Sequence, residues 1–158
     1  MLATSVKAQV SGVGTPAGPV FRPEAFFLGR TEGTGILKIM FRRHRVVHVH
    51  GDGRIDPSGA LILDQDVEDA GKPVQHRRWK MQSLGGGSYA ATLSDATGPV
   101  VGTVERDTLR LVFREKGGFR IKQSLVLLSD GKGARNRLTI RKMGIVVATL
   151  NETIRRID

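Results

Sequence analysis

The residues best suited to hold a small molecule lie two apart in the segment 74–84, where Arg77 is followed by Trp79. Residues two apart in a strand share a face. A guanidinium that can grip a carboxylate or phosphate bidentately would therefore lie beside an apolar indole. Three polar residues have the same inward parity in other segments: Gln65, Gln123 and Asn136. Together these five residues predict a ligand-binding site. The alternative is that Arg77 pairs with an internal acid or with backbone carbonyls and is structural.

Other reactive residue types do not combine into a catalytic or metal site. Three histidines share a strand face, but the parity that turns Val47 and Val49 inward turns them outward: His44, His48 and His50. A row of acids is also outward and is better explained as partners of nearby arginines: Asp64, Asp66 and Glu68. The chain has no cysteine, and no Ser-His-Asp pattern is visible. We therefore predict no catalytic residue, no metal and no cofactor.

The elements that must position these residues are short strands, separated by turn signals about every ten to twelve residues. Pro23 and Glu24 favour a short helical turn over 23–28 that closes one end. The strands are expected at 31–40, 45–55, 60–68, 74–84, 88–93, 99–105, 109–115, 119–128, 135–142 and 145–155. Ten strands with tight connections predict an all-β, antiparallel up-and-down barrel, since closure removes the sheet edges.

The length of 158 residues predicts one barrel domain over 21–158, after a flexible tail of small residues, glycine and proline over 1–20. No charged leader precedes a long apolar run, and no apolar run approaches the roughly 18 residues that a membrane helix needs. A cytoplasmic protein is the default expectation.

The charge of the chain is concentrated in its second half. Residues 1–75 hold 9 basic and 8 acidic residues, whereas residues 76–158 hold 16 and 7. Parity turns seven cations of three consecutive strands outward: Arg110, Arg114, Arg120, Lys122, Arg135, Arg137 and Arg141. We call these seven residues the basic wall. It predicts contact with an anionic surface, and a face kept only for solubility is the alternative.

Five segments, in this order and spacing, resemble an uncharacterised bacterial family that is calycin-like. They are F-R-P-E-A-F-F-L-G-R-T, D-Q-D-V-E-D-A-G, R-R-W-K-M, D-A-T-G-P-V-V-G-T-V and K-M-G-I-V-V-A-T-L. Members of that family are often labelled putative lipoproteins or domains of unknown function. The resemblance implies a barrel of the lipocalin and fatty-acid-binding type and no known reaction. The lipoprotein cysteine is missing here, so membrane anchoring is not implied.

Two hypotheses about function follow from these patterns. The first is a non-enzymatic binding module that holds a small, partly apolar and anionic ligand inside the barrel. The second is an interaction protein whose basic wall docks on acidic lipid or on the backbone of RNA. Sequence-specific nucleic-acid readout is not expected, because the wall lacks interleaved aromatic residues. The pattern does not define an oligomeric state.

Overall fold

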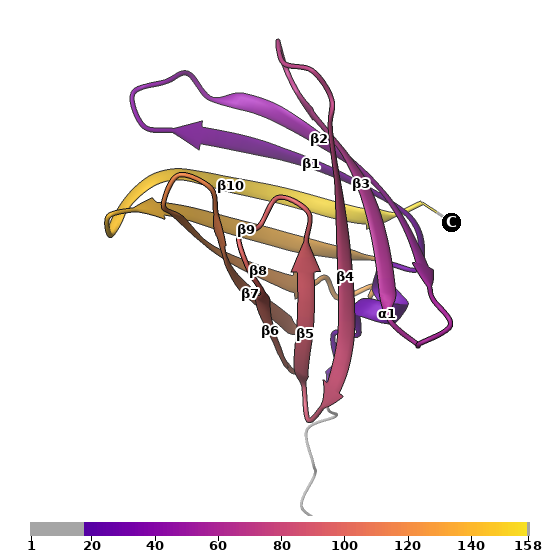
Figure 1. Cartoon of the computed structure of the whole chain (residues 1–158). Helices are drawn as coiled ribbons and strands as arrows, with labels where there is room; N and C mark the ends of the chain where they lie inside the picture. The colour runs from indigo at the N-terminus through magenta and orange to yellow at the C-terminus, as the bar shows by residue number, and fades with distance from the viewer. Residues whose placement is uncertain (1–17, 158) are drawn as a thin grey trace, which may run out of the picture.

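Ten antiparallel strands form a closed barrel in which each strand pairs with its neighbours in the chain and β1 pairs with β10 (Figure 1). The computed structural model describes residues 18–157. A helix, α1 (Pro23–Phe26), precedes the strands β1 (Gly29–Ile39), β2 (Arg45–Ile55), β3 (Leu61–Asp69), β4 (Gln75–Gly85), β5 (Ser88–Leu93), β6 (Val100–Glu105), β7 (Thr108–Glu115), β8 (Phe119–Leu127), β9 (Gly133–Lys142) and β10 (Ile145–Arg156). The all-β up-and-down barrel predicted from the sequence is confirmed.

The predicted helical turn is shorter than expected. It ends at Phe26, with Phe27 as its C-cap, and Gly29 at φ 86° then turns the chain into β1. Phe26 and Phe27 are buried, whereas Leu28 is 45% exposed and does not join them. Leu28 lies beyond the cap, outside the apolar contact that the helix makes. Residues 1–17 of the predicted tail lie outside the described residues.

The end of the barrel next to α1 is filled by apolar side chains. Phe21, Phe26 and Phe27 pack against one another, and Phe26 and Phe27 meet edge to face at 4.9 Å. The strand ends nearest to them contribute to the same buried cluster: Leu61, Met81, Tyr89, Leu109, Leu125 and Ile154. The hydroxyl of Tyr89 donates a hydrogen bond to Glu24 Oε2 at 3.0 Å, which ties α1 to β5. We call this end the closed end.

The opposite end carries the turns that follow the odd-numbered strands, because strands of an up-and-down barrel alternate in direction. The β1–β2 and β9–β10 turns project toward the same side of the molecule, the left of Figure 1. We call this end the open end. Among residues 18–157, no helix is long and apolar enough to cross a membrane.

Candidate functional site

A cavity of about 240 Å³ lies inside the barrel toward the open end. Most of its wall is aliphatic or aromatic: Leu37, Val47, Val49, Val67, Pro73, Phe113, Ile121, Leu138, Ile140 and Leu150. The polar lining consists of Asp69, Lys72, Gln75, Arg77, Asp95, Glu115 and Asn136. An apolar wall with a few polar groups is the usual composition of a small-molecule site.

Arg77 contacts the predicted residues Gln65 and Trp79 through one shared atom. The Arg77 Nε–H and the Trp79 Nε1–H both donate to Gln65 Oε1, each at 2.9 Å. This follows from the register, in which Gln65 of β3 lies opposite Arg77 of β4. Within the described residues Arg77 makes no other hydrogen bond and no ion pair. Its two terminal nitrogens therefore remain available to a ligand in the cavity.

The charges around Arg77 are unusual for the inside of a barrel. Burial lowers the pKa of the Arg77 guanidinium, and the carboxylates of Glu152, Asp95 and Glu115 oppose that shift. Burial raises the pKa of Glu152, against a hydrogen bond from Asn136 and the charge of Arg77. Burial and the nearby charge of Asp95 also raise the pKa of Glu115. Desolvation favours the neutral forms of Glu115 and Glu152. Their neutral forms reduce the negative charge that an anionic ligand would meet.

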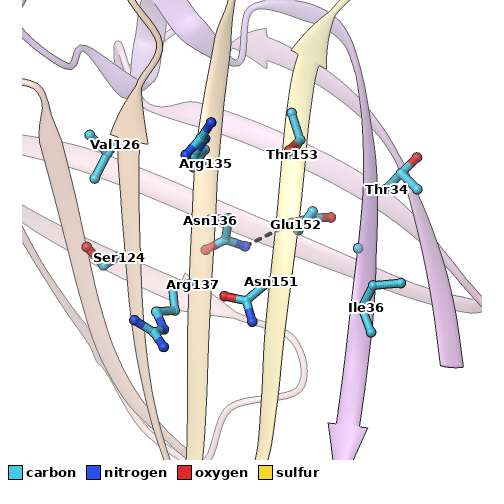
Figure 2. A pocket seen from close by; sticks show the side chains of 11 residues that line it. Thr34, Ile36, Ser124, Val126, Arg135, Asn136, Arg137, Asn151, Glu152 and Thr153 are labelled. Carbon is cyan, nitrogen blue, oxygen red and sulfur yellow. Dashed lines mark hydrogen bonds between the residues drawn. The ribbon is translucent and has the colours of Figure 1, made fainter. Parts of the chain in front are cut away.

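Glu152 is the buried group that the sequence reasoning missed. It is 7% exposed, and its Oε1 accepts a hydrogen bond from Asn136 Nδ2 at 2.8 Å (Figure 2). Gly33 of β1 makes room for it, since a Cβ there would collide with Glu152 Oε2. Parity could have found it, because Ala148, Glu152 and Ile154 share the inward face of β10.

The five predicted ligand-binding residues all point into the barrel, as parity indicated, but they occupy different layers. Arg77 and Asn136 line the cavity. Gln65 and Trp79 are buried behind Arg77. Gln123 is buried, but it is not part of the cavity lining. A direct contact with a ligand therefore fits Arg77 and Asn136 best, and a role in binding stays a prediction for all five.

The outer face of β2–β4 interleaves charges of both signs. Asp64 accepts two hydrogen bonds from Arg78 and one from Arg54, and these bonds lower the pKa of Asp64 to about 2. Further contacts on this face join His76 Nδ1 to Asp66 Oδ1, and His50 Nε2 to Glu68 Oε1 at 3.4 Å. His48, His50 and the three acids point outward as predicted, and the acids contact basic residues. His44 precedes β2, so it does not share the strand face predicted for it.

The basic wall covers the outer face of β7–β9. Arg114, Arg120 and Arg141 lie directly opposite one another across the three strands, as do Arg110, Ser124 and Arg137. Arg110 Nη1 lies 3.7 Å from Glu105 Oε2, so one cation of the wall has an acidic neighbour on β6. The other six have no ion pair within the described residues.

Surface depressions border the basic wall, and two of them lie around Ser124. The larger, of about 610 Å³, crosses β8, β9, β10 and β1, with Arg135 and Arg137 beside Ser124, Asn151 and Thr153 (Figure 2). The second, of about 310 Å³, has Arg110, Lys122 and Arg137 around Ser124. Cations beside hydroxyl and amide groups can contact phosphate-type anions.

Residues 2–156 match the model of a protein family described as "Protein of unknown function (DUF3833)". The chain belongs to the DUF3833 family. No curated protein matches it.

Three solved structures are similar to this DUF3833 member in fold. One is the S-type phycobiliprotein lyase CPES from Guillardia theta, with a TM-score of 0.69 and 7% identity over 85% of this chain and 90% of that chain. Another is a DUF3598 protein of unknown function from Nostoc punctiforme, with a TM-score of 0.65 and 14% identity over 92% and 53%. The third is Rv2717c from M. tuberculosis, with a TM-score of 0.64 and 17% identity over 91% and 99%. At these identities the similarity concerns the fold.

Proposed function

We propose that the protein is a binding module that holds a small, partly apolar ligand with an anionic group inside its barrel. The observation that carries this proposal is Arg77, which lines a cavity with both apolar and polar walls and whose terminal nitrogens have no partner among the described residues. A ligand carboxylate would offset the desolvation of the guanidinium through a charge-assisted, bidentate contact. Its hydrocarbon part would lie against the aliphatic wall.

The acids near Arg77 set a condition on this proposal. Asp95, Glu115 and Glu152 would repel a ligand anion if all of them were ionised. The raised pKa values of Glu115 and Glu152 favour their neutral forms, and these acids lie outside ion-pair distance of Arg77. An anionic group bound to Arg77 would therefore lie closer to the guanidinium than to these carboxyl groups.

Trp79 offers a direct test, since it is the one tryptophan of the chain and shares Gln65 with Arg77. Octanoate should change its fluorescence in a saturable way. Arg77→Gln should weaken octanoate binding by about 1.5–3 kcal/mol, the range for a hydrogen bond to a charged group. The same variant should lose less binding free energy for octan-1-ol, which has the same chain length without the charge.

The matched control is Arg78→Gln, because Arg78 is the next residue of β4 and points outward to Asp64. It should leave octanoate binding unchanged. Equal losses of octanoate and octanol in the Arg77 variant would contradict the role of Arg77. So would an equal loss of octanoate in the Arg78 variant.

A second candidate function is docking on an anionic surface through the basic wall. It is favoured by the six wall cations without an ion pair, since like charges on neighbouring strands repel one another. The triple variant in which Arg110, Arg135 and Arg137 are replaced by Gln should elute from heparin at clearly lower salt than the wild type. Equal elution would mean that the wall is a solvated face.

A further inference from the structure

Two large apolar side chains stand almost fully exposed at the tips of neighbouring hairpins. Phe41, in the β1–β2 turn, is 97% exposed, and Met143, in the β9–β10 turn, is 91% exposed. They are the two most exposed large hydrophobic residues among residues 18–157. The hairpins are neighbours because β1 pairs with β10, and Met40 N donates to Val147 O at 2.9 Å beyond the last pair (Figure 1).

Both tip residues also have an unfavourable backbone. Phe41 has φ 62° and Met143 has φ 51°, the left-handed region that glycine adopts without strain. A glycine or asparagine would suit either turn better. Strain and apolar exposure at the same two positions indicate a surface kept for contact, since strained residues cluster at functional sites.

The chain around both tips is basic and contains no acid. Residues 33–51 and 131–151 have no Asp or Glu, and they include Arg42 and Arg43 beside Phe41, and Arg141 and Lys142 beside Met143. Within the described residues, Arg42, Arg43 and Arg141 form no ion pair. The acids of the cavity mouth belong to other elements, namely the ends of β3 and β7 and the β5–β6 connection: Asp69, Glu115 and Asp95.

A third depression, of about 560 Å³, adjoins the Met143 tip. It is lined by Arg114, Lys116, Arg120 and Arg141, with Met143 and Gly144 at its edge. The three arginines are the row that crosses β7, β8 and β9. One acid, Glu115, belongs to the same lining. This depression combines several cations with an exposed apolar side chain. Such a surface is complementary to a lipid, whose anionic phosphate headgroup lies above an apolar acyl chain.

We propose that the open end docks on an anionic phospholipid bilayer, with Phe41 and Met143 entering the acyl boundary and the surrounding arginines contacting lipid phosphates. Apolar insertion combined with cation attraction is how proteins bind a membrane interface without crossing it. RNA fits the tips less well, because Phe41 is the one aromatic side chain there and Met143, Ile145 and Val146 cannot stack on bases. The inference is independent of whether the cavity holds a ligand.

The test is co-sedimentation of the full chain with vesicles of phosphatidylcholine containing phosphatidylserine, and with vesicles of phosphatidylcholine alone. The wild type should sediment with the anionic vesicles and should not sediment with the neutral ones. The double variant Phe41→Gly and Met143→Gly should bind the anionic vesicles at least tenfold more weakly. Glycine suits both φ angles, so this variant should fold and should keep the wild-type retention on heparin.

Leu84→Ser is the matched control, because Leu84 is 65% exposed next to the β4–β5 turn at the closed end. It should bind vesicles as the wild type does. The proposal is overturned if the wild type fails to bind anionic vesicles, or if the double glycine variant binds them equally well. Binding of the wild type to an RNA duplex but to neither vesicle type would overturn it as well.

Discussion

Asn136 and Glu152 form a buried polar pair that is only half satisfied. One hydrogen bond joins them, and Asn136 Oδ1 and Glu152 Oε2 have no hydrogen-bond partner. Asn136 Oδ1 points away from Glu152 (Figure 2), and Glu152 Oε2 can only accept when the carboxyl is ionised, whereas a protonated carboxyl could donate. The raised pKa of Glu152 agrees with this, since burial favours its neutral form.

Glu152→Gln should make the protein more stable at neutral pH. The folded-state pKa of Glu152 is raised, so its favourable contribution is complete below the unfolded value and is lost as pH rises through the folded value. Glutamine does not ionise, and its amide oxygen can still accept the hydrogen bond from Asn136 Nδ2. We expect about 1–2 kcal/mol more stability at neutral pH, the scale of one unsatisfied buried group.

Urea unfolding at acidic and at neutral pH measures this difference. The gain should shrink as pH falls below the folded-state pKa of Glu152, where the wild-type carboxyl is protonated as well. Glu105→Gln, on the exposed end of β6, should show no such pH-dependent gain. A Glu152 variant that is less stable than the wild type at neutral pH would mean that the ionised carboxylate stabilises the fold.

Sequence alone could predict single residues where one rule decides their orientation. Period-2 parity placed Arg77 and Trp79 inside, because both lie in one uninterrupted strand. It could not predict that Gln65 would join them, since that contact depends on the register between β3 and β4. Glu152 was missed although its parity was readable, because no residue of the last strand was assigned to a face.

The strands themselves were predictable because turn residues mark their ends. β2 and β5 begin and end where expected, and the other strands differ by at most two residues at either end. The largest shifts at a strand start, two residues each, are at β1, which begins at Gly29 rather than at 31, and at β9, which begins at Gly133 rather than at 135. The residue pattern did not show how early α1 ends, because cap geometry decides that.

The contact between α1 and β5 predicts a measurable coupling. Tyr89→Phe removes the hydroxyl that donates to Glu24 while the ring keeps its place against the phenylalanines. We expect a loss of about 1 kcal/mol of unfolding free energy, typical of one partly buried hydrogen bond.

A double-mutant cycle with Glu24→Ala isolates that coupling in urea unfolding experiments. The interaction energy should be close to the loss in Tyr89→Phe alone. Additive effects of the two changes would show that the Tyr89 hydroxyl does not hold α1 to the barrel.

The whole molecule divides into a closed end filled by aromatic and aliphatic side chains and an open end with a cavity. The sequence predicted closure of the sheet, because ten strands in a meander leave two edges that can pair. It could not predict how far the core extends or where space remains. Both depend on which side chains meet across the barrel, as Trp79 and Phe113 do at 5.5 Å.

The distribution of charge over the barrel likewise needed the structure. The acids of β3 pair with residues of β2 and β4, which leaves the cations of β7–β9 without such compensation. Parity predicted which cations point outward. Their lack of partners, and the contact of Arg110 with Glu105, depend on the strand order around the barrel.

Methyl NMR of the protein titrated with octanoate tests most directly whether the ligand lies inside the barrel. Val46 and Val47 are adjacent in β2 and point to opposite sides, as do Ile36 and Leu37 in β1. The methyl groups of Val47, Leu37 and Ile140 should shift with one common dissociation constant, while those of Val46 and Ile36 stay unchanged. Shifts confined to the outward methyl groups, or no shifts with octanoate in large excess, would contradict the binding-module account.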